Sequence, residues 1–208
     1  MKRLSIILAV AIAFMTGSIY AQTSANALVK KTIDKLNSHK NIEISFDYQV
    51  SNGDAGLSKK DTGKAIMQGD AYRLEIADQQ ISSDGKTLWT YLVDNKEVMV
   101  SDASNDDNIM TPIKLISTYD KNYKMRFVNT KEKGVKAVEM TNAKSDFNKV
   151  IMKIDEATNT IKGAEIYDVN GSKYIVTITK TVTDKKLGSK TFSFDTAAHP
   201  DVEVIDMR

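Results

Sequence analysis

Few side chains in this sequence are suited to catalysis. There are two histidines, His39 and His199, and no cysteine, which excludes a thiol nucleophile, a thiolate metal ligand and any disulfide. Serine and aspartate are plentiful, but no Gly-x-Ser-x-Gly turn or similar motif supports a nucleophile activated by either histidine. We therefore expect both histidines to occupy surface positions, and the protein to have no catalytic residues, no cofactor and no enzymatic activity.

One acidic segment has part of a metal-binding pattern. Residues 102–108 (DASNDDN) begin with oxygen-bearing side chains at the alternating spacing of a calcium loop. Asp107 occupies the sixth position, where such a loop requires glycine, and Ile113 occupies the twelfth, where it requires glutamate. The segment is therefore predicted to be a solvated acidic loop without a metal site.

The beginning of the chain has the features of an export signal. A basic start (MKR) precedes the apolar run 4–14 (LSIILAVAIAF), and the sequence IYA at 19–21 provides a cleavage site. The apolar run is too short to span a bilayer. We predict that residues 1–21 are removed on export to the periplasm and that residues 22–208 form a single domain.

The charges of the exported part are balanced. The whole chain has 29 Lys and Arg and 27 Asp and Glu. Because the leader contains Lys2 and Arg3 and no acidic residue, its removal leaves equal numbers of basic and acidic residues. A surface without net charge argues against nucleic acid or an anionic membrane as the main partner.

Two segments have helical patterns. Residues 24–38 (SANALVKKTIDKLNS) place apolar residues and one threonine on a single stripe at helical spacing, which predicts an amphipathic helix in need of a partner surface. The members of the stripe are Ala25, Leu28, Val29, Thr32, Ile33 and Leu36. Near the middle of the chain, Thr111-Pro112 followed by an apolar stripe predicts a second helix.

From residue 42 onward the apolar period becomes two. Residues 42–50 (IEISFDYQV) alternate apolar and polar side chains, which predicts a strand with one buried face. Asn170-Gly171 predicts a tight hairpin between two later strands. Further strands are predicted at 64–69, 71–77, 87–93, 96–101, 123–129, 134–141, 148–155, 160–167, 172–181 and 190–194.

The number of strands predicts the architecture. About eleven short antiparallel strands would form one strongly curved sheet or half-barrel, because an open flat sheet of that size curls or splits. The two helices would lie on its concave face. The strand at 87–93 is apolar on both faces, with Leu88 on one and Trp89 and Tyr91 on the other, so both of its faces must be covered. Four rows of side chains could line the concave face: Tyr72/Leu74/Ile76, Val150/Met152/Ile154, Tyr174/Val176/Ile178 and Phe192/Phe194.

Residues 69–100 (GDAYRLEIADQQISSDGKTLWTYLVDNKEVMV) resemble the LolA family of periplasmic lipoprotein carriers. In that family, an aromatic-Arg-apolar strand precedes an S-D-G-k-x-l-W-x-Y hairpin. The start ANALVKKTIDKLNSHKNIEISFDYQ is similar to the family's first helix and strand, and TPIKLI at 111–116 to its helix-starting s/t-P-x-x-L-L. The end FSFDTAAHPDVEVIDMR is similar to the family's terminus, so the resemblance covers essentially all of residues 22–208.

The resemblance implies an α+β fold, an incomplete antiparallel β-barrel of about 11 strands with a helical lid over an apolar cavity. It also implies a function: the cavity takes the acyl chains of a lipoprotein at the inner membrane, and the carrier shuttles them across the periplasm to the outer membrane. The implied partners of this monomer are acylated lipoproteins and the inner-membrane ABC transporter that releases them. At about 0.8 kcal/mol per methylene, one exposed chain of about fifteen methylenes costs on the order of 12 kcal/mol in water.

The same resemblance assigns roles to individual residues. The acyl-chain cavity would be lined by Tyr72, Leu74, Trp89, Tyr91 and Met99. The lid would be formed by Leu28, Val29, Leu36, Ile113, Leu115 and Ile116. Well-known members have an Arg-Pro pair whose arginine bonds to the lid, whereas this sequence has Gln68-Gly69 there. Gln68 and Arg73 are the candidates for a lid contact.

Two other functions fit the same sequence. The first is a carrier of a different lipid, such as a glycolipid, which would bind free lipid and ignore lipoproteins. The second is an envelope-stress or interaction module, which would bind a protein partner while its cavity stays empty.

Overall fold

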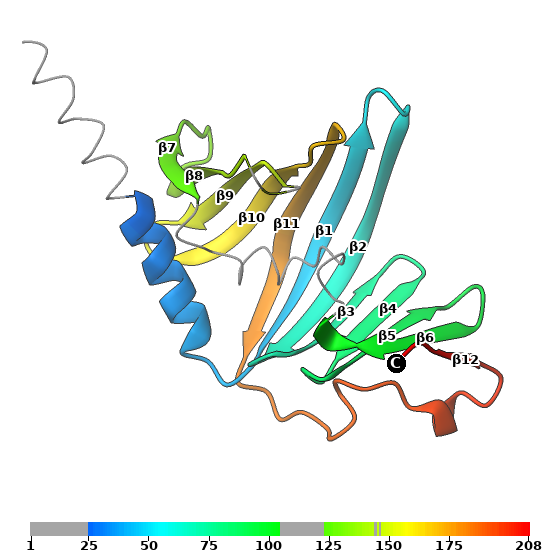
Figure 1. Cartoon of the computed structure of the whole chain (residues 1–208). Coiled ribbons are helices and arrows are strands. Elements are labelled where there is room, and N and C mark those ends of the chain that lie inside the picture. The colour runs from blue at the N-terminus through cyan, green and yellow to red at the C-terminus, as the bar shows by residue number, and fades with distance from the viewer. Residues whose placement is uncertain (1–24, 105–122, 144, 146) are drawn as a thin grey trace, which may run out of the picture.

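The computed structural model describes residues 25–104, 123–143, 145 and 147–208. The predicted leader, most of the acidic segment and the lid residues Ile113, Leu115 and Ile116 lie outside this part. The described residues form one helix over 25–37, a short 3-10 helix (Thr196–Ala198) and a single twelve-stranded sheet that is not closed into a barrel (Figure 1). The predicted fold class, an open half-barrel with a helix, is confirmed.

The strands are antiparallel except at one edge. Their order across the sheet is β12-β6-β5-β4-β3-β2-β1-β11-β10-β9-β8-β7, and only β12 pairs in parallel, with β6. The bounds are β1 (Ile42–Asn52), β2 (Leu57–Gln68), β3 (Ala71–Ile76), β4 (Gln79–Ser83), β5 (Thr87–Leu92), β6 (Glu97–Asp102), β7 (Lys124–Val128), β8 (Val135–Thr141), β9 (Lys149–Asp155), β10 (Thr160–Tyr167), β11 (Ser172–Thr183) and β12 (Glu203–Asp206).

The set of predicted strands needs three corrections. Strand β4 was not predicted, because its sequence QQISS is mostly polar, although its last three residues are buried. Strand β12 was also missed. The strand predicted at 190–194 is wrong: this segment forms turns, and its alternating Phe192 and Phe194 do not join the sheet.

The Asn170-Gly171 hairpin is confirmed. It joins β10 to β11, with Tyr167 paired to Lys173. Gly171 has φ +81°, a conformation that costs glycine little. The Asp168 carboxylate accepts the backbone N–H groups of Asn170 and Ser172, which satisfies two donors that the tight turn leaves without a strand partner.

The helix lies over part of one face of the curved sheet (Figure 1). Ala25 and Val29 are fully buried and belong to the same apolar cluster as the sheet residues Ile44 and Leu74. Leu28 and Leu36 pack against that cluster from its edge. The predicted amphipathic helix and its apolar stripe are therefore confirmed, and the sheet is the partner surface that the stripe needs.

The end of the helix is fixed to the end of β11. His39 Nδ1 lies 2.8 Å from Asp184 Oδ2, and the backbone N–H of Lys40 donates to the other oxygen of that carboxylate at 2.8 Å. The hydrogen bond from His39 lowers the pKa of Asp184. Asn41 and Lys185 exchange two further hydrogen bonds between side chain and backbone. His39 is therefore only partly exposed, and it holds one end of the helix beside the sheet.

Candidate ligand-binding site

Strand register decides which side chains share a face, because directly paired residues on neighbouring strands point the same way. One such line of pairs crosses β1 to β6 on the face that the helix covers. It consists of Ile44, Ala65, Leu74, Ile81, Thr90 and Met99. We call this the inner face, and the opposite one the outer face.

The five residues proposed for the cavity wall do not share a face. Leu74 and Met99 lie in the line above, and Tyr72 is two residues from Leu74 on β3, so all three are on the inner face. Trp89 and Tyr91 pair with Val100 and Val98 and point to the outer face. The prediction that these two aromatic residues line the same wall therefore needs correction.

The C-terminal segment covers the outer face at Tyr91. The centroid of the Tyr91 ring lies 5.0 Å from that of Phe194 and 5.7 Å from that of His199. The rings of Phe194 and His199 stack with their centroids 4.7 Å apart. Val98, beside Tyr91, has no exposed surface. Strand β5 is thus apolar on both sides because the inner face contributes to the core and the outer face is covered by the tail. The tail also places His199 among aromatic rings and not on an open surface.

The inner face forms a continuous apolar surface over most of the sheet. Residues from β1 to β5 and from β7 to β11 belong to one buried cluster that also includes two residues of the helix. Met125 on β7 pairs with Met140 on β8, and Met152 on β9 is a diagonal neighbour of Met140 in the same cluster. Such flexible and polarizable side chains can repack around ligands of variable shape.

A pocket remains where the helix meets the sheet. It is lined mainly by Leu36 of the helix and by Ile42, Ile44, Met67 and Ile161 of the sheet. Its volume is about 70 Å³, whereas pockets that hold a small ligand measure roughly 300–1,000 Å³. A long ligand can therefore enter this part of the inner face only if the helix moves away from the sheet.

The two candidates for a lid contact point away from the helix. Arg73 donates from Nε to Glu75 Oε1 at 2.8 Å on the outer face. Gln68 is exposed at the end of β2, next to the turn at Gly69. Within the described part of the chain, neither side chain bonds to the helix at 25–37.

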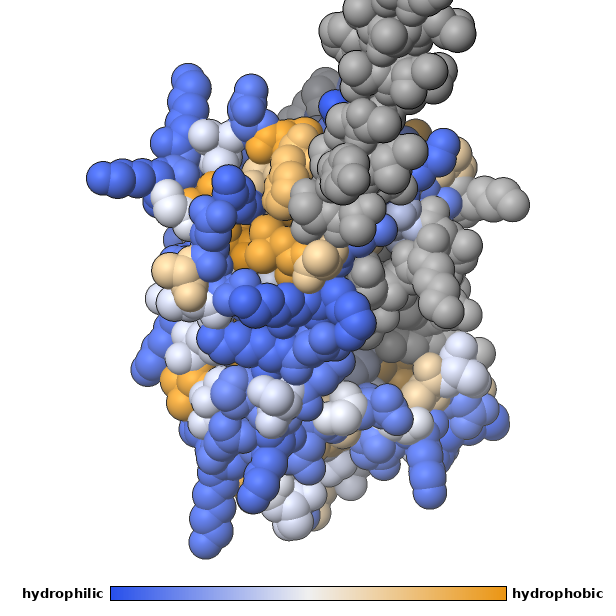
Figure 2. All heavy atoms as spheres, turned by 90° about the vertical axis from the view of Figure 1, so that its left-hand side faces the viewer, coloured by the Kyte–Doolittle hydropathy of each residue, from blue (hydrophilic) through white to orange (hydrophobic). Residues whose placement is uncertain are grey.

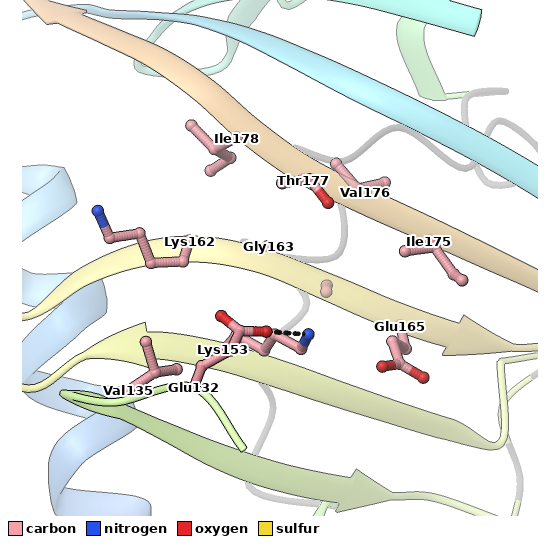
Figure 3. A pocket seen from close by; sticks show the side chains of 11 residues that line it. Glu132, Val135, Lys153, Lys162, Gly163, Glu165, Ile175, Val176, Thr177 and Ile178 are labelled. Carbon is pink, nitrogen blue, oxygen red and sulfur yellow. Dashed lines mark hydrogen bonds and ion pairs between the residues drawn. The ribbon is translucent and has the colours of Figure 1, made fainter. Parts of the chain in front are cut away.

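Where the tail does not cover it, the outer face carries paired charges among a few apolar side chains such as Ile175. Figure 3 shows a groove over β9, β10 and β11, where Lys153 meets Glu132 at 2.5 Å beside Gly163, Glu165 and Thr177. Lys173 also pairs with Glu165 at 2.8 Å, and this contact lowers the pKa of Glu165. These paired charges belong to a solvated surface, in contrast to the apolar inner face.

The helix turns a hydrophilic side toward the solvent. Lys30, Lys31, Asp34 and Lys35 are exposed, and Lys30 pairs with Asp34 at 2.6 Å. Figure 2 views the molecule from the side on which the helix lies, and hydrophilic residues surround a smaller hydrophobic patch there. The apolar stripe of the helix is therefore turned inward, toward the sheet.

Two searches over the described residues bear on other kinds of site. None of their His, Asp and Glu side chains gather in groups of three or more that could hold a metal ion. Among the same residues, no helix is long and apolar enough to cross a membrane.

Two comparisons with known proteins point to the same family. Residues 26–195 match the family described as "Outer membrane lipoprotein carrier protein LolA". An outer-membrane lipoprotein carrier protein of Legionella pneumophila (strain Lens) is 28% identical over 211 residues, which cover 97% of this chain and 98% of that protein.

Two solved structures share the fold. An uncharacterized conserved protein from Thermus thermophilus has a TM-score of 0.57 at 9% identity, covering 86% of this chain and 96% of that one. A DUF1329 family protein from Desulfovibrio piger has a TM-score of 0.51 at 12% identity, covering 86% and 99%.

Proposed function

Because the chain belongs to the LolA family of outer-membrane lipoprotein carriers, we propose that it binds the acyl chains of lipoproteins on the inner face of its sheet. In this proposal the carrier takes the lipoprotein from the inner membrane, crosses the periplasm and delivers it to the outer membrane. The protein makes and breaks no covalent bond in this process. Tyr72, Leu74 and Met99 stay in the proposed binding surface, whereas Trp89 and Tyr91 do not.

The observation that supports the proposal most strongly is the continuous apolar inner face of an open sheet. Seventeen buried strand residues form one cluster there with Ala25 and Val29 of the helix, and the helix at 25–37 covers only part of the sheet. A closed barrel would leave no route for a bulky cargo, whereas an open sheet admits chains once its cover moves. With roughly 0.8 kcal/mol per buried methylene, such a face can offset the cost of keeping acyl chains in water.

The helix at 25–37 is proposed as a lid. It contacts the sheet through small or medium apolar side chains and is fixed at its end by the His39–Asp184 contact. A helix anchored at one end can swing away from the sheet without breaking strand pairs. The other proposed part of the lid, around Ile113, Leu115 and Ile116, belongs to the same hypothesis.

The family supports a proposal for the partners and the location. We propose that the protein acts as a monomer in the periplasm. It would receive acylated lipoproteins from an inner-membrane lipoprotein-release ABC transporter. The alternative of a carrier for free lipid predicts the same inner face with a different cargo, so the experiment must distinguish the two.

Two substitutions on one strand provide a matched test of the binding face. Ile178 and Ile175 lie on β11, and both are partly buried, but Ile178 packs on the inner cluster while Ile175 points to the outer face. We expect the unmodified protein to release a labelled triacylated lipoprotein from inner-membrane vesicles as a one-to-one complex. Ile178→Glu should abolish this release, because a carboxylate would have to be buried among acyl chains. Ile175→Glu should retain it.

Circular dichroism establishes that both variants are folded before release is measured. If the unmodified protein releases no lipoprotein but extracts free lipid, the cargo is a free lipid. If it extracts neither, the carrier function is wrong. Equal release by the two variants would contradict binding on the inner face.

A further inference from the structure

The inner face differs in chemistry between its two ends. The end where β1 begins is apolar, since Leu36, Ile42 and Ile161 surround the small pocket there. The end where β1 finishes carries aromatic and hydroxyl groups instead. We call the residues Tyr48, Tyr123, Ser145 and Tyr174 the hydroxyl cluster.

These residues come from four separate segments and are connected through a series of neighbouring contacts. Tyr48 pairs with Val176, and Val50 with Tyr174, so Tyr48 and Tyr174 are diagonal neighbours on one face. The Tyr174 ring lies 6.5 Å from that of Phe147. The backbone N–H of Phe147 and the hydroxyl of Tyr123 both donate to Ser145 Oγ at 3.2 Å.

Two hydroxyl protons of the cluster are available for a ligand. Ser145 Oγ already accepts two hydrogen bonds, so its own O–H is left to donate. The Tyr48 hydroxyl makes no hydrogen bond to another of the described residues, although Tyr48 packs against the core cluster. Burial raises the pKa of Tyr48 and that of Tyr174, so both remain protonated donors at neutral pH.

Building on the proposed function, we propose that the hydroxyl cluster binds the carbonyl groups of the lipoprotein's acylated glyceryl-cysteine head. The acyl chains then run along the inner face, and their methyl ends reach the apolar end at Ile42. The attached polypeptide leaves the carrier beside the β10–β11 turn. The cargo is therefore held in one orientation.

The chemistry of the cluster favours this head group over an anionic one. Ester carbonyls accept hydrogen bonds and donate none, so they complement the free O–H donors of Tyr48 and Ser145. The Tyr174 hydroxyl donates to Asp168 Oδ2 at 3.3 Å, which places a carboxylate beside the cluster. Asp61, which pairs with Tyr48, is a second carboxylate in this row, and Lys59, which pairs with Val50, is a cation there. The two carboxylates together disfavour a phosphate or a free fatty-acid carboxylate.

The distance between the two ends of the inner face fits the length of a single acyl chain. Ile42 and Tyr48 are six residues apart on β1, or roughly 20 Å along the strand. This is about the length of one extended long acyl chain. A chain whose ester is bound at Tyr48 therefore reaches the pocket at Ile42 without folding back.

The orientation is tested with a synthetic triacylated lipopeptide that carries a nitroxide on its acyl chains, either near the ester or near the methyl end. In NMR spectra of the complex, the label near the methyl end should broaden the signals of Ile42 and Ile161. The label near the ester should broaden those of Val50 and Tyr174. The reverse pattern, or equal broadening at both ends, would overturn the orientation while leaving the carrier function intact.

A pair of variants tests the hydrogen bonds themselves. Tyr48→Phe should weaken binding of the lipopeptide by about threefold to tenfold, and should leave binding of a hydrocarbon-chain dye without carbonyl groups unchanged. Tyr167→Phe is the matched control, because Tyr167 donates to Glu165 on the outer face, and it should change neither affinity. Unchanged lipopeptide affinity in Tyr48→Phe would refute the role of that hydroxyl. If the unmodified protein does not bind the lipopeptide at all, the proposed function fails and the orientation fails with it.

Discussion

Cross-linking the helix at 25–37 to the β9–β10 turn is expected to reduce lipoprotein uptake to the level of a reaction without the protein. Lys35 Nζ donates to the carbonyl oxygen of Thr158 at 2.6 Å, so thiols at these two positions can be joined by a short linker. With this second attachment beside the His39–Asp184 contact, the helix can no longer swing away from the sheet as a rigid body, and the pocket beneath it is too small for an acyl chain. Since the chain has no cysteine, the variant Lys35→Cys/Thr158→Cys has only the two intended thiols.

The cross-link has a matched control on the outer face. Lys173 and Glu165 lie on adjacent strands and form a 2.8 Å ion pair, and these strands do not have to separate during uptake. Lys173→Cys/Glu165→Cys joined by the same linker should therefore retain uptake. A reducible linker allows uptake to be measured before and after cleavage in one sample, and uptake should return when the helix is released. Full uptake with the helix still linked would mean that this helix is not the lid.

Gly163→Ala is expected to cause the largest loss of stability among single substitutions by alanine at the glycines of the sheet. A β-carbon at Gly163 would lie 2.3 Å from the carbonyl oxygen of Val176 and 3.3 Å from the α-carbon of Thr177. Both are backbone atoms of the paired strand β11, so relief requires β10 and β11 to move apart. We expect the free energy of unfolding to fall by about 3 kcal/mol, with Tm lowered by roughly 6–12 °C.

The control for Gly163→Ala is a substitution at a glycine that has open space for a β-carbon. Gly53, in the β1–β2 turn, has no positive φ, and no atom lies within 4 Å of the position that an added β-carbon would take. Gly53→Ala should therefore change the free energy of unfolding by no more than about 0.5 kcal/mol. Thermal unfolding of the two variants checks both values. Similar Tm values would show that β10 and β11 are not packed at Gly163 as described.

The sequence could predict the helix and most strands because their apolar periods are regular. The stripe through Leu28, Val29 and Leu36 and the alternation over 42–50 each have one buried side, and burial of one side sets both the period and the register. The half-barrel class followed from the number of such strands. Strand β4 was not predicted because Ser82 and Ser83 are buried polar residues, and a hydrophobic pattern does not detect buried polar residues.

The candidate site was predicted only in part, for a reason that lies in β5. Leu88 and Trp89 alternate between two covered faces, so composition alone could not decide which of them points to the helix. The cover over Tyr91 is the C-terminal segment, far away in sequence, whose Phe192 and Phe194 were mistaken for a strand. The hydroxyl cluster was missed as a site, although Tyr48 is on the apolar side of its strand and Tyr174 was placed in a lining row.

The central claim is that acyl chains bind on the inner face, and nuclear Overhauser contacts between a bound triacylated lipopeptide and the protein's methyl groups test it most directly. Ile151 and Met152 are neighbours in the sequence, as are Ile175 and Val176, and the two members of each pair point to opposite faces. Met152 and Val176 point to the inner face, and Ile151 and Ile175 to the outer face. The account predicts contacts from the acyl methylenes to the methyl groups of Met152 and Val176 and none to those of Ile151 and Ile175. Contacts to Ile151 and Ile175 in their place would contradict it.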